Sequence, residues 1–586
     1  MKYNINFLTS QLLVETLVKL GLKHVCLSPG SRNTPVTLAF ARNERIEKKV
    51  FVDERSSAFF ALGIAKATGL PVAVVCTSGT AAAEVYPAIV EAYSAQVPLI
   101  VITADRPEYL KNTGSNQTIN QINIYSANCD HFFDPGLPES SLSYLRGIVE
   151  LSNIAFSRTL HPVKGPVHIN LPFEKPLEPS SYNCEVSESD LNSLRSLMNL
   201  TRQHKSESLQ KDFADENSFG MLSNQKTVII LANKQYDFEF LKKIAQFSKD
   251  QNIPVCLEAT VDVPVPLKNT FVQNLGNMLQ SPKFVDQFNP DKIIIFGRNP
   301  VSKNLERYLN SCDVPLFVVN TKGENFGKAA TNKKIIRMDE NDFIESITTH
   351  EIYPSKSGEK FYQRIHKSDE IFSKELLDAF KKKSLDSEVE AMALLASIVS
   401  IAQDVPVFVS NSLPIRDLDF LKQFFPNPVY SNRGASGIDG IISTAAGIAS
   451  AKNSPLLLII GDLSFHYDSN SLHFLKKYNI PLLIILMNNC GGSIFEYLPI
   501  YSKSDEFDTY FKADTEIDFT SLVIAYGLKY RNVNSVNLLK TCINAFFDNP
   551  SPTVLELKFD SIKSKEKKDK LKIRILEVFE KNLLFP

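Results

Sequence analysis

The sequence lacks an apolar run long enough to cross a membrane. Its prominent apolar runs, 456–460 and 480–487, have the length of buried strands, whereas a membrane helix needs roughly 18 residues or more. The first residues, MKYNINFLTSQ, also lack the basic start, apolar stretch and small-residue cleavage site of a secretion signal. We therefore expect a cytoplasmic protein without a membrane partner.

The sequence also lacks an excess of charge of either sign and any paired cysteine spacing. Its 64 basic residues nearly balance its 65 acidic residues, so no global field would concentrate nucleic acid. Nucleic acid is not expected as a partner, and any recognition of an anion must be built from individually placed side chains. The eight cysteines are scattered, which predicts reduced thiols that serve in packing.

What is present is an alternation of short apolar strands with helical patterns over 586 residues. This alternation predicts α/β domains with parallel sheets and crossover helices. The strands are expected at HVCLS, KVFVD, VAVVC and PLIVITA, at TVIILAN, IPVCLE, KIIIFG and PLFVVN, and at PVFVSN, PLLLIIGD, PLLIILMNN and TVLELKF. We predict three consecutive α/β domains at 1–180, 226–350 and 386–586, with a linker at 181–225 and a linker helix at 351–385. The basic segment 563–572 is predicted to be a solvated helix face.

Two of the expected strands end in side chains that suit a metal ion. Asp462 follows the run LLLIIG, and Asn489 follows PLLIILMN, 27 positions later. Because the carboxyl ends of parallel strands meet at one edge of a sheet, these residues can converge. A carboxylate, an amide oxygen and a backbone carbonyl form a partial oxygen shell for Mg²⁺ that phosphate oxygens would complete. The alternative is an aspartate that only caps a helix and a glycine-containing segment that only turns.

The chain resembles the thiamine-diphosphate-dependent enzymes, whose signature begins Gly-Asp and closes with Asn-Asn. The matching stretches here are GDL at 461–463, where many members have a third-position glycine, and NN at 488–489. Further motifs are SPGSRNTP at 28–35, VDERS at 52–56, TSGT at 77–80, TADRP at 103–107 and SNRGASGIDG at 431–440. Together they resemble one family, the 2-succinyl-5-enolpyruvyl-6-hydroxy-3-cyclohexene-1-carboxylate synthases of menaquinone biosynthesis.

This resemblance implies a three-domain α/β fold of the thiamine-diphosphate-enzyme type. The domains would be a pyrimidine-binding domain, a central domain and a diphosphate-binding domain. They would assemble as a homodimer or homotetramer with the active site between subunits. The implied cofactors are thiamine diphosphate and Mg²⁺, with Mn²⁺ possible. The implied transferase reaction decarboxylates 2-oxoglutarate and adds the succinic-semialdehyde unit to isochorismate.

By the same resemblance, one group of residues would bind the cofactor. Glu54 would contact the aminopyrimidine ring and activate the cofactor, although by position alone it would be an ordinary acid at a helix start. Ile438 would hold the cofactor bent, and Ser436 and Gly437 would offer backbone contacts. The diphosphate and metal site would comprise Gly461, Asp462, Leu463, Ser464, Asn489, Gly491 and Gly492, with Asp462, Asn489 and Gly491 as the metal ligands.

A second group would bind the two dicarboxylate substrates. Arginine suits this task because its planar fork pairs with a carboxylate and keeps its charge when partly buried. The motifs imply that Arg32, Arg106, Arg416 and Arg433 act at the catalytic centre. Other implied substrate contacts are Ser31, Asn116, Gln117, Ser412, Ile494, Leu498 and Lys303. An isolated arginine is more often a surface charge, and Lys303 could equally be a surface lysine.

Two other functions remain open from the sequence. The cofactor motifs also permit another thiamine-diphosphate decarboxylase or ligase that acts on a different 2-oxo acid. A catalytically silent scaffold that still binds the cofactor is the second alternative. The joint presence of Glu54, Asp462, Asn489 and the arginines favours the enzyme.

Overall fold

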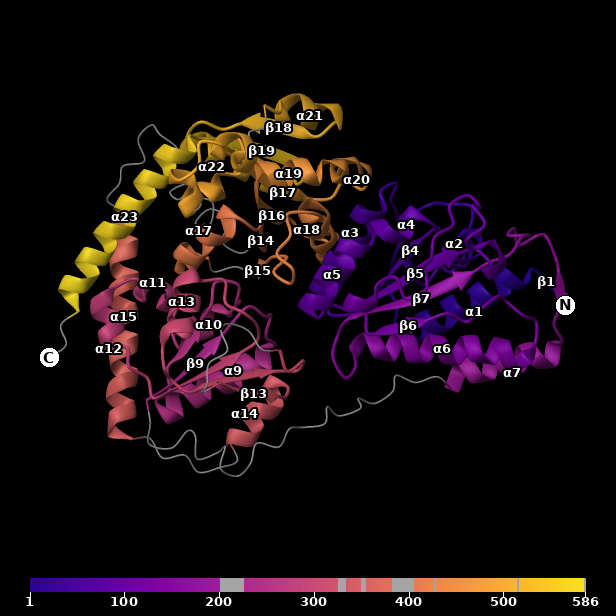
Figure 1. The fold of residues 1–586 in the computed structure, drawn as a ribbon, viewed down its shortest axis with the longest axis horizontal. Helices are drawn as coiled ribbons and strands as arrows, with labels where there is room; N and C mark the ends of the chain where they lie inside the picture. Colours follow the sequence, from indigo (N-terminus) through magenta and orange to yellow (C-terminus); the bar gives the residue numbers. More distant parts are fainter. Residues whose placement is uncertain are drawn as a thin grey trace. The chain divides into compact units, whose positions relative to one another are not determined.

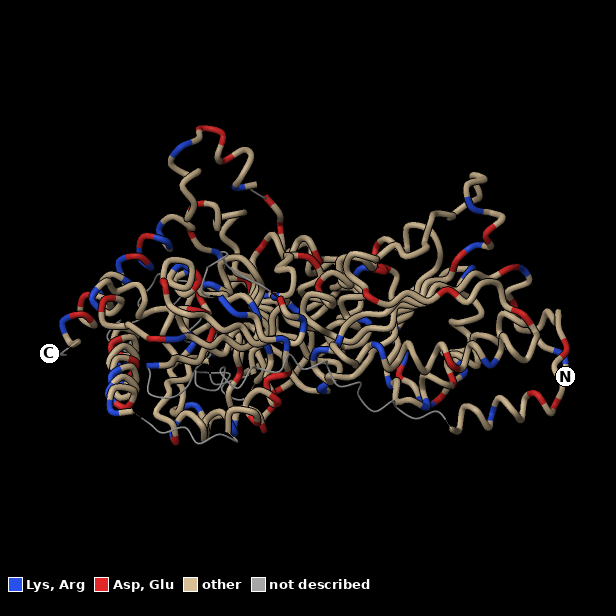
Figure 2. The backbone as a smooth tube through the Cα atoms, turned by 60° about the horizontal axis from the view of Figure 1, so that its bottom comes forward, with Lys and Arg blue, Asp and Glu red and all other residues tan. Residues whose placement is uncertain are grey.

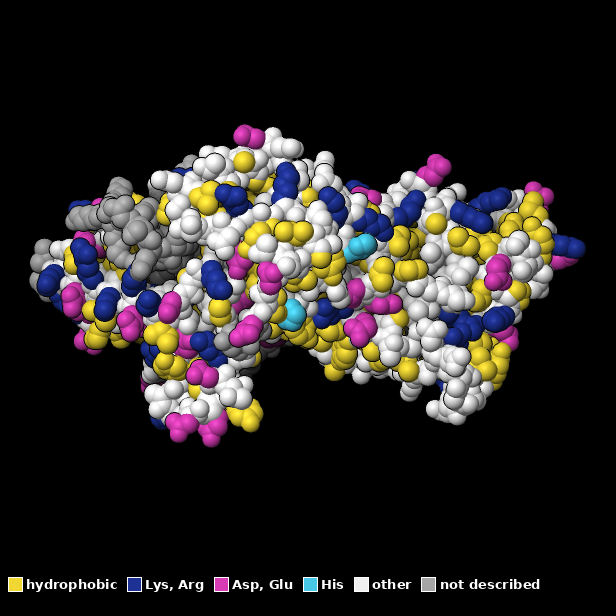
Figure 3. Space-filling model, turned by 90° about the horizontal axis from the view of Figure 1, so that it is seen from above, with side chains coloured by type: hydrophobic (Ala, Val, Ile, Leu, Met, Phe, Trp, Pro, Cys, Tyr) yellow, Lys and Arg dark blue, Asp and Glu magenta, His cyan; other side chains and the backbone are white. Residues whose placement is uncertain are grey.

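The computed structural model describes residues 1–200, 226–324, 333–348, 355–381, 405–425, 428–513 and 516–583. The residues form two compact units. The first contains 1–200, 432–456 and 464–482, and the second contains the other described residues from 226 onward. Within the described ranges, no helix combines the length and apolar character needed to cross a membrane. Basic and acidic side chains are interspersed along the backbone (Figure 2) and on the face drawn in Figure 3.

The first unit is built on a parallel six-stranded sheet of order β3-β2-β4-β5-β7-β6. Its strands are β2 (His24–Leu27), β3 (Glu47–Val50), β4 (Val72–Cys76), β5 (Leu99–Asp105), β6 (His131–Phe133) and β7 (Pro166–Pro172). Its helices are α1 (Ile5–Leu20), α2 (Thr34–Ala41), α3 (Glu54–Thr68), α4 (Thr80–Glu84), α5 (Tyr86–Ala95), α6 (Leu142–Leu160) and α7 (Glu188–Leu200). A short antiparallel pair joins β1 (Lys2–Tyr3) and β8 (Cys184–Glu185).

Helices cover both faces of this sheet (Figure 1). One face shares a core with α1, α2, α6 and α7, and α3 packs against β2 and β4. The same unit includes α18 (Ile441–Lys452) and α20 (Leu472–Lys477). Helices α3 and α18 cross closely, because a Cβ on Gly63 would lie 2.1 Å from the carbonyl oxygen of Thr444. Glycine at this crossing therefore permits backbone-to-backbone packing.

The second unit contains two sheets. The five-stranded sheet has the order β10-β9-β11-β12-β13, with β9 (Thr227–Leu231), β10 (Val255–Leu257), β11 (Lys292–Phe296), β12 (Leu316–Asn320) and β13 (Lys333–Arg337). The six-stranded sheet has the order β15-β14-β16-β17-β19-β18, with β14 (Val407–Val409), β15 (Val429–Tyr430), β16 (Leu456–Gly461), β17 (Leu482–Asn488), β18 (Lys529–Asn532) and β19 (Thr553–Lys558). The strand pairs within both sheets are parallel.

The described helices that lie wholly in the second unit are α9 (Phe238–Gln251), α10 (Val265–Lys268), α11 (Leu275–Met278), α12 (Pro282–Gln287), α13 (Lys303–Ser311), α14 (Glu340–Thr348), α15 (Lys356–Lys381), α17 (Leu413–Leu421), α21 (Phe519–Ala525), α22 (Val536–Asp548) and α23 (Ser561–Asn582). Helices α11, α12, α13, α15, α17, α22 and α23 join the two sheets in one hydrophobic core, whereas α9 and α14 contribute to a second core on the five-stranded sheet. Helix α19 (Asp462–Tyr467) starts in the second unit and continues into the first. Helices α15 and α23 pack together, partly through Phe372 and Phe579, whose ring centroids lie 5.3 Å apart.

The three parallel sheets confirm the predicted α/β class, and all twelve predicted strand segments overlap strands. Strand β7 was missed because Pro166 and Pro172 bound it, and proline is a typical strand breaker. Between β4 and β5 the helical segment is interrupted at Val85, so that α4 ends there and α5 begins anew with Pro87 in its first turn. The predicted domain boundaries stay a prediction. Residues 201–225, which complete the predicted linker, and residues 386–404 lie outside the described residues.

The prediction for residues 563–572 is confirmed only in part, because the segment is helical and Lys563 and Lys570 are exposed, but other lysines are not. Lys568 of α23 is only 7% exposed and pairs with the equally buried Asp417 of α17. Lys565 donates a hydrogen bond of 2.7 Å to the carbonyl oxygen of Glu496 and lies over the ring of Tyr497. The lysine-rich composition suggested a solvated face, but the aliphatic stems of lysine can be buried when the ammonium group has a partner.

Candidate active site

Glu54 is the first residue of α3, directly after strand β3 and its short loop. The helix begins here because the Asp53 carboxylate caps it and accepts a 3.1 Å hydrogen bond from the N–H of Ser56. A helix N-terminus favours the ionised form of an acid. Burial nevertheless outweighs this effect and raises the pKa of the Glu54 carboxyl group, with Asp53 and Glu84 adding like-charge repulsion. Glu54 is therefore an acid that holds its proton to a higher pH than an exposed glutamate does.

The loop after β2 places Arg32 in a buried position. Its Nη1 donates a 2.6 Å hydrogen bond to the carbonyl oxygen of Phe173, and its side chain is 5% exposed. Desolvation lowers the pKa of the Arg32 guanidinium, and the nearby charge of Arg106 lowers it further. Ser31, by contrast, is exposed. Two arginines held close together against their mutual repulsion form a strong site for an anion.

Arg106 follows strand β5 and belongs to the loop that carries Asn116 and Gln117. Its Nη2 donates a 3.0 Å hydrogen bond to the carbonyl oxygen of Asn116. The Nε atoms of Arg32 and Arg106 are both buried without a hydrogen-bond partner. Buried donors of this kind normally have an acceptor, so a carboxylate ligand would satisfy them. The structure thus brings four predicted residues, Arg32, Arg106, Asn116 and Gln117, to one side of the first sheet.

A buried polar network beneath these arginines was not predicted from the sequence. The fully buried Asp105 carboxylate accepts hydrogen bonds from the Arg106 N–H at 2.7 Å and from Asn170 Nδ2 at 3.0 Å. Gln121 donates to Asn170 and accepts a 2.9 Å bond from the N–H of Gly79. The network therefore ties the loop of Arg106 to the TSGT loop and to β7. Asn170 lies on the strand that the sequence pattern missed, so no local signal could identify it.

The residues predicted near the aminopyrimidine lie in a loop at 432–440. Ser436 has φ of +63° and Gly440 has φ of +60°. A Cβ on Gly440 would lie 2.0 Å from the ring of Phe59 in α3, so glycine is required there. Arg433, Gly437 and Ile438 are half-buried.

The predicted diphosphate anchor lies at the carboxyl ends of β16 and β17, which are neighbours in the sheet. The Asp462 carboxylate is 3% exposed and accepts 2.8 Å hydrogen bonds from the N–H groups of Gly491 and Leu463. Burial raises the pKa of this carboxyl group, although these N–H groups oppose the shift. Asn489 lies directly after β17 and is half-buried, while Ser464 is buried in α19.

This arrangement fits a divalent cation that carries a diphosphate. The Asp462 carboxylate faces the backbone N–H groups of Leu463, Asn489, Cys490 and Gly491, so the chain turns tightly around this acid. Its buried charge would be stabilised by a cation. A Cβ on Gly461 would meet no atom within 4 Å, which leaves open space beside the strand end. Gly492 has another reason to be glycine, because a Cβ there would lie 2.9 Å from the carbonyl oxygen of Phe511.

No group of three or more His, Cys, Asp and Glu side chains suited to a metal occurs in the described ranges. The anchor does not depend on such a group, because its expected protein ligands are one carboxylate, one amide and one backbone carbonyl. Oxygen ligands of this kind, with phosphate and water, are typical of Mg²⁺.

The remaining predicted substrate residues lie in the second unit. Ser412 precedes α17 with φ of +71°. Arg416 of α17 donates a hydrogen bond to the carbonyl oxygen of Val301. Lys303 is exposed and pairs with Glu306 one helical turn away at 2.6 Å, an ordinary surface arrangement. Ile494 is half-buried and Leu498 is 49% exposed, in the short helical segments after Gly492.

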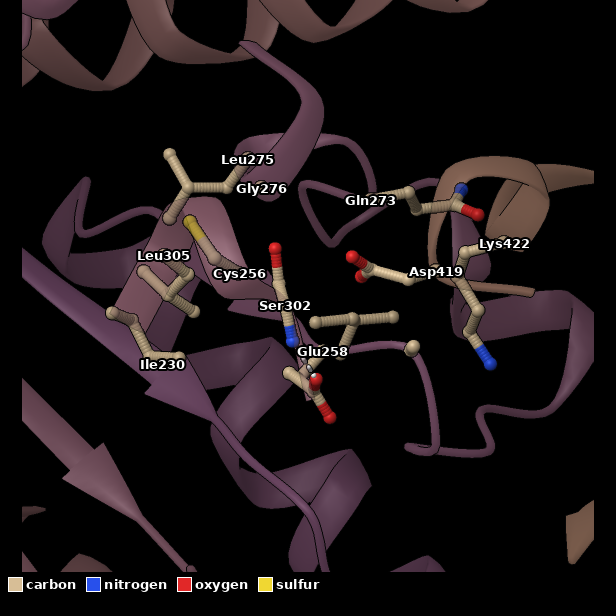
Figure 4. Close-up of a pocket in the computed structure, with 12 residues that line it drawn as sticks. Ile230, Cys256, Glu258, Gln273, Leu275, Gly276, Ser302, Leu305, Asp419 and Lys422 are labelled. Carbon is tan, nitrogen blue, oxygen red and sulfur yellow. Dashed lines mark hydrogen bonds between the residues drawn. The ribbon is translucent and has the colours of Figure 1, made fainter. Parts of the chain in front are cut away.

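The second unit also contains a small polar cavity of about 10 Å³, lined by Glu258, Ser302 and Asp419 among others (Figure 4). The buried Glu258 carboxylate on its wall accepts hydrogen bonds from the N–H groups of Val301 and Ser302. Burial, with the charge of Glu258, raises the pKa of Asp419 to about 7. The cavity has room for about one water molecule, so it is too small for a substrate.

Comparison with known proteins agrees with this geometry. Residues 8–124 match the family description "Thiamine pyrophosphate enzyme, N-terminal TPP binding domain", and residues 419–557 match "Thiamine pyrophosphate enzyme, C-terminal TPP binding domain". The first range contains Glu54, Arg32 and Arg106, and the second contains Asp462 and Asn489.

Curated relatives match almost the whole chain. A 2-succinyl-5-enolpyruvyl-6-hydroxy-3-cyclohexene-1-carboxylate synthase of Crocosphaera subtropica is 34% identical, with 95% of each chain covered. Proteins of the same name from Microcystis aeruginosa and Bacillus cytotoxicus are 35% and 33% identical, covering 91% and 89% of this chain and 92% and 88% of their own. This chain belongs to the 2-succinyl-5-enolpyruvyl-6-hydroxy-3-cyclohexene-1-carboxylate synthase family of thiamine pyrophosphate enzymes.

Proposed function

We propose that this chain is a thiamine-diphosphate-dependent transferase of menaquinone biosynthesis. It decarboxylates 2-oxoglutarate and joins the succinic-semialdehyde unit to isochorismate, giving 2-succinyl-5-enolpyruvyl-6-hydroxy-3-cyclohexene-1-carboxylate and CO₂. The observation that carries the proposal is the contact between Asp462 and Gly491 at the ends of two neighbouring strands. It supports an anchor for a metal-bound diphosphate, and the similarity over 95% of the chain supports the reaction.

Asp462, Asn489 and the carbonyl group of Gly491 would hold Mg²⁺, or Mn²⁺ in its place. Gly461, Leu463, Ser464 and Gly492 would border the diphosphate. When bound, thiamine diphosphate supplies the carbanion chemistry that decarboxylation of a 2-oxo acid requires. The protein's own residues would orient the group and manage its protons.

Glu54 would hold a proton at the aminopyrimidine ring nitrogen. Its raised pKa supports this role, because a carboxyl group that retains its proton can donate a hydrogen bond to a ring base. Ile438 would be the apolar support of the bent cofactor, and Ser436 and Gly437 would offer backbone contacts.

The arginines would bind the substrate carboxylates. Arg32 and Arg106 are close enough to lower the pKa of Arg32, which supports a shared anion site. Arg416, Arg433, Ser31, Ser412, Asn116, Gln117 and Lys303 are assigned to the same task, and Ile494 and Leu498 to apolar contact with the substrate. To bind substrate, the ammonium group of Lys303 would have to leave its ion pair with Glu306.

We further propose a cytoplasmic homodimer or homotetramer whose active site is completed by a second copy. Glu54 belongs to the first unit, whereas Asp462 and Asn489 belong to the second. Val50 and Val52, shortly before Glu54 in the chain, are 42% and 79% exposed, and neighbouring exposed apolar side chains are suited to contact another copy. Light scattering should give the mass of at least two chains, and a monomer that is active at all dilutions would refute this assembly.

The reaction is tested by incubating purified protein with thiamine diphosphate, Mg²⁺, 2-oxoglutarate and isochorismate. We expect CO₂ release and a product whose mass equals isochorismate plus the succinic-semialdehyde unit. Release of CO₂ from another 2-oxo acid alone would indicate a different decarboxylase or ligase. Binding of the cofactor without CO₂ release from any 2-oxo acid would indicate a scaffold.

A further inference from the structure

Glu91 of α5 holds the backbone of the 432–440 loop. Glu91 is buried, and its two carboxylate oxygens accept hydrogen bonds from the N–H of Gly434 at 3.0 Å and the N–H of Ala435 at 2.7 Å. The two partners are about 343 positions away along the chain. A buried carboxylate that accepts from consecutive backbone N–H groups fixes the position of the main chain itself.

Lys66 of α3 compensates the buried charge of Glu91. Its Nζ lies 3.1 Å from Glu91 Oε1, and the two side chains are 10% and 4% exposed. The same Nζ donates a 2.8 Å hydrogen bond to Asn432 Oδ1, and Asn432 Nδ2 donates to Thr444 Oγ1 of α18 at 2.9 Å. Both side chains of the Lys66–Glu91 pair thus form hydrogen bonds with the 432–440 loop.

Shape reinforces these bonds at both ends of the loop. A Cβ on Gly434 would lie 2.7 Å from the carbonyl oxygen and from the Oε2 of Glu91, so the loop backbone rests directly on α5. At the other end, Gly440 rests on the ring of Phe59. The loop is therefore fixed at Gly434 and at Gly440.

The middle of the loop borders a cavity instead of packed side chains. This cavity has a volume of about 210 Å³ and is lined by Phe59, Pro87, Val90, Glu91, Asn432, Ala435, Gly437 and Asp439. Ser436, with its positive φ, and Gly437 belong to this part of the loop. A segment that is fixed at its ends and open at its centre is suited to present backbone groups to a ligand.

We propose that Glu91, supported by Lys66, is a positioning residue that sets the 432–440 loop for the aminopyrimidine part of thiamine diphosphate. This inference rests on the proposed function, because it assigns Ser436, Gly437 and Ile438 to that ring. Glu91 itself touches the loop backbone and acts only through it. If the Lys66–Glu91 pair had a purely structural role, its loss would instead change the affinity for every ligand equally, or for none.

The distinction can be measured by comparing two ligands. Thiamine diphosphate uses both the 432–440 loop and the anchor at Asp462, whereas inorganic pyrophosphate with Mg²⁺ uses the anchor alone. In Glu91→Gln, one carboxylate oxygen becomes an NH₂ group that cannot accept from a backbone N–H. We expect at least a tenfold weaker binding of thiamine diphosphate by titration calorimetry, with pyrophosphate binding unchanged.

Hydrogen exchange of the protein without ligand supplies a second readout. The amides of residues 432–438 should exchange at least tenfold faster in Glu91→Gln, while those of β5 keep their rates. Glu15→Gln is the matched control. Glu15 lies in α1, away from this loop, and its carboxylate pairs with Arg45 and Asn43. It should leave both ligands and the loop amides unchanged.

Three further variants, Glu91→Asp, Lys66→Arg and Lys66→Met, keep the inference testable if Glu91→Gln does not fold. Glu91→Asp keeps the negative charge near Lys66 but shortens the side chain by one methylene. Its hydrogen bonds to the loop should weaken, so the loop amides should exchange faster. Lys66→Arg keeps the cation and should restore most of the affinity that Lys66→Met loses. The inference is overturned if Glu91→Asp and Lys66→Met bind thiamine diphosphate like the wild type, or if they lose both ligands equally. Failure of the wild type to bind thiamine diphosphate would instead refute the proposed function.

Discussion

Asp462 accepts a 2.8 Å hydrogen bond from the N–H of Gly491, across 29 positions of sequence. This bond joins the ends of β16 and β17 and places the buried carboxylate beside the segment that begins with Asn489. A buried carboxylate with a raised pKa is suited to receive a metal ion, since the cation would relieve the cost of its burial.

We predict that Asp462→Ala abolishes binding of thiamine diphosphate in the presence of Mg²⁺. The carboxylate is the only charged protein ligand assigned to the metal, so its loss should raise the dissociation constant more than a hundredfold, about 3 kcal/mol. Titration calorimetry with and without Mg²⁺ measures the effect. Unchanged affinity would show that Asp462 is not a ligand of the metal.

Glu54→Gln should leave thiamine diphosphate bound but slow the exchange of its C2 proton. Glutamine preserves the size of the side chain and cannot transfer a proton, and removal of a general acid or base typically slows a reaction by about 10²–10⁴-fold. Deuterium exchange of the bound cofactor, followed by NMR after quenching, reports the rate. Exchange at the wild-type rate would exclude Glu54 from this step.

Replacement of Arg106 by Gln should raise the KM for substrate more than tenfold and leave cofactor affinity unaltered. The neighbouring Arg32 would lose its partner in a bidentate anion site. Arg146→Gln is the matched control, because Arg146 is exposed on α6 and donates to Ser193. If substrate and cofactor requirements rise equally in the Arg106 variant, the arginine is structural.

The Lys568–Asp417 pair should stabilise the second unit only as a pair. Lys568→Met leaves the Asp417 carboxylate buried without its cation, which should cost about 3–5 kcal/mol of unfolding free energy. The double variant Lys568→Met with Asp417→Leu should regain most of this loss, because neither charge is then buried. The free energy of unfolding is measured with urea for the wild type, the two single variants and the double variant. Additive effects of the two substitutions would contradict the pairing.

Stability should fall as pH rises from about 4 to about 7, partly because of Asp468. Burial raises the pKa of this carboxyl group from 3.8 to about 7 in the folded protein. Between these values the folded state binds more protons than the unfolded state, so the free energy of unfolding decreases with pH. Asp468→Asn should flatten the slope by on the order of 1 kcal/mol per pH unit, as thermal unfolding across this range can show. An unchanged slope would contradict the raised pKa.

The sequence pattern determined the class of fold and the ends of its key strands. Apolar runs such as those before Asp462 and Asn489 predict parallel strands, and the carboxyl ends of neighbouring parallel strands meet at one edge of a sheet. Likewise, the capping residue Asp53 sets the start of α3 and therefore the position of Glu54. These features are local, so a single stretch of sequence contains the signal for each.

Only the tertiary structure decided which distant side chains meet. Three such contacts join residues that are dozens to hundreds of positions apart. Arg32 lies near Arg106, Glu91 accepts a hydrogen bond from Gly434, and Lys568 is buried against Asp417. Hydrophobic periodicity reports which face of an element is buried, but it carries no information on the partner. A buried charge is stable only with its partner, and the partner is chosen by how the sheets and helices pack.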